Sequence, residues 1–286
     1  MRLFVLLLCP LITIGQKECN GFVLDKITGN KVPYATVGLT KENRGVSANA
    51  EGAFSINASF PQVDCLRVSS VGYVTQVLPV ASWVNGKVVE LRQETALLKE
   101  VVVVPNQKKQ IYSLNKFSRC SWNSYHIGLE TIYQLAQRFE APREGMQLVE
   151  LELCKDPSET VFRLRIYDID SLSQSPFQDR ADSVIEVRSS ESHMRIDLEK
   201  YHVFIPGKSF FVAIEWLFVP LNEEQEKVKR SGRTTVHVFY KPFLRWVTNR
   251  NLKKGKVWRL NFNGKWSEIP RSNQDYNFQI TTKLRS

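Results

Sequence analysis

Four carboxylates crowd one loop-like segment, YDIDSLSQSPFQDRADS, and they are Asp168, Asp170, Asp179 and Asp182. They bracket polar residues at a point where a strand is expected to end. Hard oxygen ligands on a loop are what Ca2+ requires, although the spacing does not match an EF-hand. The same side chains can instead cap turns or pair with Arg163, Arg165 or Arg180. The segment therefore predicts either a calcium site or structural loop carboxylates, and no other cofactor is expected.

Tryptophans among basic residues form a second candidate site near the C-terminus. A Trp ring on a surface can stack on a sugar ring, and a neighbouring Arg or Lys can pair with an acidic group. The residues that combine these properties are Arg245, Trp246, Lys253, Lys254, Trp258 and Trp266. They predict a face that binds an acidic glycan or an anionic surface. Packing in the core is the alternative for each Trp, as is expected for Trp216 within FVAIEWLFV.

The spacing of an enzyme site is missing from the sequence. The four histidines, which are His126, His193, His202 and His237, stand in no HxxE, HExxH or HxH pattern. There is no GxSxG, no glycine-rich phosphate loop and no GxGxxG after a predicted strand. The sequence therefore predicts a protein that is not an enzyme and that has no catalytic residues.

Cysteine spacing leaves two alternatives open. The chain has five cysteines, and four remain if Cys9 leaves with a signal peptide. Export would permit disulfides, and four cysteines allow three connectivities. The local pairing within each predicted domain is Cys19–Cys65 and Cys120–Cys154. Free thiols that act as small hydrophobes are the alternative, and no CxxC or Cys/His spacing indicates zinc.

Positive charge is concentrated at the C-terminal end. The formal net charge is +10, and residues 225–286 hold fifteen Lys and Arg against three Asp and Glu. Residues 16–105 hold nine against eight, and residues 106–224 hold fourteen against eighteen. Such a local field attracts acidic glycans or anionic headgroups, whereas the alternative is a set of solvated strand faces. Nucleic acid is not expected as the partner of an exported chain.

The N-terminal residues, MRLFVLLLCPLITIGQ, have one Arg, an apolar run and small residues before Gln16. This pattern predicts a secretory signal peptide over residues 1–15, against the alternative of a buried strand. A lipoprotein signal at Cys9 is disfavoured because bulky leucines precede it. No other stretch reaches the roughly 18 apolar residues of a membrane helix. We therefore expect an exported protein without a transmembrane segment in the mature chain, located in the periplasm or associated with the outer membrane or cell surface.

Short apolar runs separated by turn residues predict an all-β protein with two domains. In residues 16–104 the candidate strands are CNGFVLD, ATVGL, GVSAN, AFSIN, LRVSSVG, VTQVLPV and KVVEL. Val101 to Val104 could form a last edge strand, and Pro105 opens a polar linker over residues 105–112. Residues 113–286 contain about nine longer candidate strands without βαβ spacing, which predicts a jelly-roll-like β-sandwich. HIGLETIYQLAQRF is compatible with an amphipathic helix, but its second half favours a strand.

The first domain resembles a known family in the segments GFVLDKITGNKVPYATVGL, GVSANAEGAFSI, LRVSSVGY and LKEVVVV. They are similar to the carboxypeptidase-like regulatory domain, a transthyretin-like seven-stranded sandwich that is a non-catalytic accessory of some metallocarboxypeptidases. The matching positions are Gly21, Val23, Asp25, Thr28, Gly29, Pro33, Ala35, Val37, Gly45, Gly52, Phe54, Gly72 and Tyr73. Two departures are an extra residue before Pro33 and Asn49 in place of the usual Asp.

This resemblance covers about residues 19–104 and implies a setting in the envelope of Gram-negative bacteria. There the same domain precedes the plug of many TonB-dependent receptors, but receptor function is not implied for the remaining residues. The sequence as a whole therefore predicts a non-catalytic envelope protein that acts as a structural or protein-interaction module. The alternative is a carbohydrate-binding surface protein that acts with or without calcium.

Overall fold

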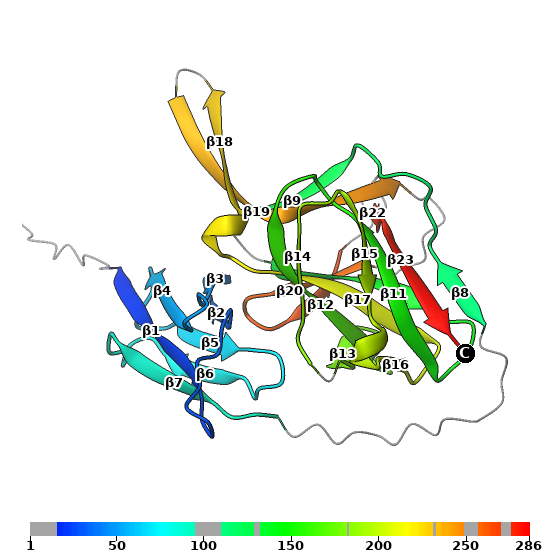
Figure 1. The fold of residues 1–286 in the computed structure, drawn as a ribbon. Coiled ribbons are helices and arrows are strands. Elements are labelled where there is room, and N and C mark those ends of the chain that lie inside the picture. The colour runs from blue at the N-terminus through cyan, green and yellow to red at the C-terminus, as the bar shows by residue number, and fades with distance from the viewer. Residues whose placement is uncertain are drawn as a thin grey trace, which may run out of the picture.

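The computed structural model describes residues 16–94, 110–128, 132–181, 183–230, 233–248, 257–269 and 276–286. Almost every regular element in these ranges is a β-strand, and the strands form two sandwiches (Figure 1). The all-β prediction is therefore confirmed. The predicted signal peptide, the Val101–Val104 strand and most of the predicted linker lie outside the described residues. The predicted linker overlaps a strand at its C-terminal end, because β8 begins at Ile111.

The first sandwich contains seven strands in two sheets. One sheet has the order β4 (Ala53–Ala58), β1 (Lys17–Asp25) and β7 (Lys87–Leu91), with β1 and β7 parallel. The other has the order β3 (Arg44–Ser47), β2 (Thr36–Leu39), β5 (Cys65–Ser69) and β6 (Gln76–Pro79). Alternation decides which side chains enter the core, since Phe54, Ile56 and Ala58 are buried while Ser55 and Asn57 are exposed.

The same alternation explains why the predicted Cys19–Cys65 disulfide does not form. Cys19 is fully buried in the core. Leu66 and Val68 point into that core from β5, so Cys65 points to the opposite face of its strand. Both side chains are free thiols in the structure, and burial raises the pKa of the Cys19 thiol.

Asp25 organises the turn that follows β1. Its carboxylate accepts hydrogen bonds from the backbone N–H groups of Ile27 and Thr28, both at 2.8 Å. It also accepts bonds from the Tyr73 hydroxyl at 2.9 Å and the Gln93 amide at 2.6 Å. The bonds from Thr28 and Gln93, followed by those from Ile27 and Tyr73, hold the pKa of Asp25 well below its usual range. Asp25 and Tyr73, two positions that match the family pattern, are thus hydrogen-bonded to each other and stabilise this turn.

We expect Asp25→Asn to reduce the acid sensitivity of the first sandwich. Because the folded-state pKa of Asp25 is lowered, its stabilisation is present above about pH 4 and is lost as the pH falls below that value. Urea unfolding at pH 7 and pH 3 should show a smaller difference for the variant than for the natural chain. Tyr73→Phe, which removes one donor, should lie between them. Equal pH dependence in all three proteins would contradict this role.

The second sandwich contains two facing antiparallel sheets around a larger core. The first comprises β13 (Pro176–Asp179), β14 (Ile185–Ser189), β12 (Thr160–Ile169), β17 (Ser209–Trp216), β10 (Ile132–Glu140), β20 (Val257–Asn261) and β21 (Trp266–Glu268). The second comprises β15 (His193–Asp197), β16 (Phe204–Ile205), β11 (Met146–Cys154), β23 (Ile280–Arg285) and β8 (Ile111–Leu114). Leu135, Phe162 and Ile214 from one sheet pack against Leu151 and Ile280 from the other.

A further sheet extends the second sandwich and consists of β18 (Glu223–Arg230), β19 (Arg233–Thr248), β9 (Ser124–Gly128) and β22 (Tyr276–Phe278). β18 and the first half of β19 form a hairpin that projects from the body (Figure 1). The β18 segment, EEQEKVKR, was not among the predicted strands because it is charged and lacks apolar alternation. The ambiguous 126–139 stretch forms parts of β9 and β10, so the preference for a strand in its second half is confirmed. No helix in the described ranges is long and apolar enough to cross a membrane.

A disulfide fixes one end of the second sandwich. Cys154, at the end of β11, is bonded to Cys120 in the segment between β8 and β9. Next to it, Lys155 is fully buried, and burial lowers the pKa of its amine. Its Nζ donates to the carbonyls of Asp156 at 2.8 Å and Ser158 at 2.6 Å. The amine is therefore committed to holding the turn between β11 and β12.

Candidate functional site

Of the four predicted calcium ligands, the three that the structure describes are Asp168, Asp170 and Asp179, and they do not form a cluster that could hold a metal ion. Asp168 pairs with Arg180 and accepts the Gln178 N–H at 2.7 Å. Asp170 accepts the N–H groups of Leu172 and Ser173, so it closes its own turn. Hydrogen bonds from Ser173 hold the pKa of Asp170 below its usual range. Within the described ranges, no group of three or more His, Cys, Asp or Glu side chains is placed to hold a metal ion. Asp182 lies outside those ranges.

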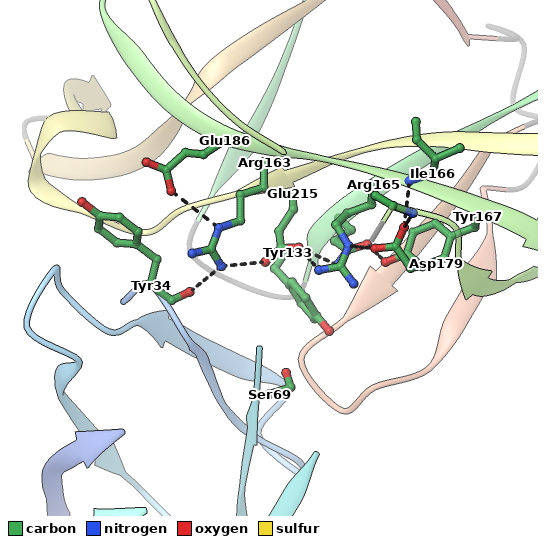
Figure 2. A network of polar contacts seen from close by, with 12 residues as sticks. Tyr34, Ser69, Tyr133, Arg163, Arg165, Ile166, Tyr167, Asp179, Glu186 and Glu215 are labelled. Atoms are coloured by element: carbon green, nitrogen blue, oxygen red, sulfur yellow. Dashed lines mark hydrogen bonds and ion pairs between the residues drawn. The ribbon is translucent and has the colours of Figure 1, made fainter. Parts of the chain in front are cut away.

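Asp179 instead belongs to a buried network on the outer face of β12 and β17 (Figure 2). It lies 2.6 Å from Nε of Arg165, whose Nη1 lies 3.2 Å from Glu215. Gln134 donates to Glu215 at 3.1 Å and accepts from the Tyr167 hydroxyl at 2.8 Å. These are buried charges that neutralise one another, which is the only favourable way to remove them from water.

The pKa values of Arg165 and Tyr167 are both raised, but for different reasons. Burial alone would lower the pKa of Arg165, but the neighbouring Asp179 and Glu215 carboxylates hold it above its usual range. Burial raises the pKa of Tyr167 well above its usual value. Arg165 is therefore charged and Tyr167 is a neutral hydrogen-bond donor at every physiological pH. Neither group is prepared to exchange a proton with a substrate.

Arg163 connects the network to the first sandwich. Its side chain is only 3% exposed, and it lies 3.7 Å from Glu186 and 4.0 Å from Glu215. Its guanidinium donates to the carbonyls of Pro33 at 3.0 Å and Tyr34 at 3.2 Å, and it lies over the Tyr34 ring. Tyr34 itself has a φ of 55°, an uncommon value for a bulky residue. The contacts of Arg163 therefore hold a strained segment of the first sandwich in place.

Phe262 provides the apolar contact at the junction between the two sandwiches. It lies in the turn between β20 and β21 and is 1% exposed. Gly38 and Gly45, which face each other across β2 and β3, leave the space for its ring. A Cβ at Gly38 would lie 2.9 Å from the Cβ of Phe262, and the opposite side of the ring stacks on Tyr133. The two sandwiches are therefore packed against each other.

We expect Gly38→Val to undock the sandwiches with little damage to either. The three atoms nearest to an added Cβ all belong to Phe262, so the clash falls across the junction. Overpacking of this kind costs about 1–3 kcal/mol. Small-angle scattering should show a larger radius of gyration, and calorimetry should separate one transition into two. Phe262→Gly in the same chain should relieve only the part of the clash made by the side chain, because the Phe262 carbonyl oxygen also lies 2.9 Å from the added Cβ. An unchanged radius of gyration in Gly38→Val would contradict the assignment.

The predicted tryptophan face is mostly packed rather than open. Trp246 packs against the main core, and Trp258 and Trp266 cover Tyr167 and Phe211 on the outer sheet face. The half-buried Arg245 donates to the carbonyl of Trp122 at 2.9 Å. Lys253 and Lys254 lie outside the described residues. The three tryptophans therefore act in packing, which was the alternative for them.

An exposed aromatic surface lies elsewhere, around Trp122 and two of the histidines. Trp122 is 96% exposed, and His126 and His237 are exposed on the outer face of the β18–β19–β9 sheet. The rings of Phe239 and Phe243 connect the two histidines. The signal that could have found this row is the alternation of aromatic residues in HVFYKPF, but the bulge between Tyr240 and Leu244 interrupts that alternation.

A shallow hollow of about 410 Å³ lies between the edge strands β14 and β15. Glu186, Arg188, Glu191 and Arg195 rim it, and Met194 forms part of its floor. Among the described strands, β14 and β15 each have one free edge, and charged side chains on such edges are a common protection against edge-to-edge association of sheets.

Comparison with known proteins identifies the first sandwich. Residues 19–103 match the family of the CarboxypepD_reg-like domain. No curated protein matches the chain.

Among solved structures, the clostridial cysteine protease Cwp84 after propeptide cleavage is 12% identical, with a TM-score of 0.42 over 88% of this chain and 66% of that chain. A structure of the protease and lectin-like domains of Cwp84 from Clostridium difficile is 12% identical, with a TM-score of 0.36 over 89% and 59%. A candidate carbohydrate-binding protein of Bacteroides uniformis is 13% identical, with a TM-score of 0.20 over 80% and 97%. The chain thus spans less than two thirds of the two protease chains. Similarity at this level carries no function from those proteins to this one.

Proposed function

Because residues 19–103 form a CarboxypepD_reg-like domain, we propose that the chain is a non-catalytic, exported binding protein of the Gram-negative cell envelope. In this proposal the first sandwich is a structural module that holds the second in a fixed orientation. The second sandwich, with the projecting hairpin, supplies the binding face. No cofactor is required.

The junction between the sandwiches is the observation that supports this proposal. Glu215 is a buried carboxylate, a type of group that enzymes use for proton transfer. Here it pairs with both Arg163 and Arg165, and Arg163 also donates to the backbone of the first sandwich. Phe262 seals the same junction. These buried polar groups fix the orientation of the second sandwich relative to the first. A fixed orientation suits a protein whose second sandwich presents a binding surface.

Location in the envelope is tested by fractionation of a Gram-negative host that expresses the full chain. We expect the protein in the periplasmic or outer-membrane fraction, with an intact mass that begins near residue 16. A cytoplasmic protein with an intact N-terminus would contradict the proposal.

Binding in the envelope is tested by photo-crosslinking from the hairpin. A photoreactive residue at Val236, which is exposed on β19, should yield one specific crosslinked envelope component. The same probe at Leu172, in the exposed turn between β12 and β13, is the control and should yield no crosslinked component. Turnover of a peptide or glycan substrate that depends on a His–carboxylate pair would instead establish an enzyme.

Carbohydrate binding is the second candidate function. The exposed Trp122 and the row of rings beside it favour this candidate. If calcium assists this binding, the Tm should rise when Ca2+ is added to the metal-free protein. That result would revive the predicted calcium site, with Asp182 among its ligands.

A further inference from the structure

We propose that the outer face of β9 and β19, from Trp122 to His237, is a binding face for a hydroxyl-rich polysaccharide chain. This inference rests on the proposed function as a binding module, and it names the ligand class and the residues. We call this surface the ring row, which comprises Trp122, His126, His237, Phe239, Phe243 and Arg245.

Four rings of the ring row are in continuous contact. His126 stacks on Phe243 with centroids 4.0 Å apart and planes 12° apart. Phe239 meets His126 edge-on at 5.6 Å and Phe243 at 6.5 Å, and His237 stacks on Phe239 at 6.4 Å. The strand rise of about 3.3 Å per residue gives the row a length of roughly 25 Å along β19. Phe243 is itself buried, at 6% exposure, and supports the stacked His126, so the rings that a ligand can reach are Trp122, His126, His237 and the half-buried Phe239. A narrow, extended strip of such ring faces suits a chain of sugar rings, whose C–H faces pack on aromatic rings.

Trp122 is presented at one end by a firmly anchored loop. Although its side chain is almost fully exposed, the residues around it are fixed to the sandwich. Cys120 is disulfide-bonded, and Ser121 bonds the side chain of Gln279 at 2.6 Å and the carbonyl of Trp246 at 2.6 Å. Upstream, the amide of Asn115 donates to two carbonyls of the β22–β23 segment. An exposed Trp on a rigid loop loses little conformational entropy on binding, which is the advantage of preorganisation.

Polar groups lie along the ring row at intervals. Arg245 is opposite Ser124 in the strand register, and its guanidinium reaches the carbonyl of Trp122. Ser124 Oγ is buried, so Arg245 is the group of this pair that a ligand can reach. At the hairpin end, Glu224 and Glu226 pair in register with Phe239 and His237, so they share the face of these rings. Donors and acceptors between ring faces are what the hydroxyl groups of a sugar chain require.

The charges of the ring row favour a glycan over a membrane surface. Glu224 and Glu226 are exposed, and carboxylates beside the rings would be repelled by anionic headgroups. The same carboxylates can accept hydrogen bonds from sugar hydroxyls. From these neighbouring carboxylates we infer a ligand that is mainly neutral, and Arg245 can pair with an occasional acidic group.

Affinity electrophoresis tests this inference with defined probes. The mature chain is run in native gels that contain laminarin, xylan, mannan, dextran or polygalacturonate. We expect retardation by at least one neutral polysaccharide, and a dissociation constant about tenfold weaker for Trp122→Ala and for His126→Ala. Leu172→Ala is the matched control, since Leu172 is 93% exposed on a distant turn, and it should bind as the natural chain does. Trp122→Ala removes an exposed side chain, so it should unfold at the same Tm as the natural chain.

Each other outcome overturns the inference in a different way. If a polysaccharide retards the natural chain, Trp122→Ala and His126→Ala equally, the glycan site lies elsewhere. The proposed function would then remain intact. Retardation by polygalacturonate alone, abolished by 0.5 M salt (roughly a 4 Å Debye length), would show a general charge effect. A photoreactive residue at Trp122 that crosslinks to an envelope protein, without retardation by any probe, would make the ring row a protein-binding face. Failure of both binding and crosslinking would also remove the proposed function.

Discussion

Replacing Arg163 with methionine is expected to lower the free energy of unfolding by about 3–5 kcal/mol and to loosen the two sandwiches. The substitution removes a buried cation and leaves the carbonyls of Pro33 and Tyr34 without their donor. It also leaves Glu215 with one buried cationic neighbour instead of two. Guanidinium unfolding gives the stability loss, and small-angle scattering reports the separation of the domains.

Arg188→Met is the matched control for this experiment. Arg188 lies on the neighbouring β14 and pairs with Glu159, but both side chains are largely exposed, at 64% and 53%. An exposed pair of this kind contributes about 0–1 kcal/mol. Arg163→Lys keeps the charge but loses the planar fork, so its stability should fall between the natural chain and Arg163→Met. Equal stability of Arg163→Met and Arg188→Met would refute the role assigned to Arg163.

Removing the Cys120–Cys154 disulfide is expected to cost about 4 kcal/mol of stability in the second sandwich. The bridge spans 34 residues, and the entropy of a closed loop of that size sets the estimate. The double variant Cys120→Ala/Cys154→Ala should unfold at a lower guanidinium concentration than the natural chain. The same shift should appear when the natural chain is unfolded in the presence of dithiothreitol.

Cys65→Ala supplies the control, because Cys65 is a half-buried free thiol. Its stability should change little, and reductant should shift its unfolding as much as that of the natural chain. A double cysteine variant that is as stable as Cys65→Ala would show that the bridge does not constrain the unfolded chain. Since the disulfide anchors the loop of Trp122, the double variant should also bind the polysaccharide probe more weakly.

The first sandwich could be predicted well from its residues because its signals are local. Alternating side chains in AFSINA and the turn residues around Gly52 act over a few positions, and the structure follows them. β18 could not be predicted in this way. Its charged residues have no strand signal of their own, and they form a strand because β19 is available as a partner.

The candidate site could be predicted only in part. Arg163 and Arg165 alternate with Phe162 and Leu164 along β12, but these outward-facing arginines are largely buried too, with side chains 3% and 14% exposed. Arg163 is buried against the carbonyl of Pro33, 130 residues away, and Arg165 is covered by Asp179 and Glu215 from other strands. Residue type likewise could not separate the packed Trp258 from the exposed Trp122.

The amino-acid sequence alone determined that this chain makes β-strands, where most of them lie, and to which family its first sandwich is similar. These properties depend on side-chain alternation and turn residues within a few positions of each other. Only the tertiary structure decided which charges are buried, how Phe262 joins the sandwiches and which aromatic rings remain exposed. Those outcomes depend on contacts between different strands, some of them joining residues more than a hundred positions apart, and no local pattern encodes which of the many possible contacts excludes water.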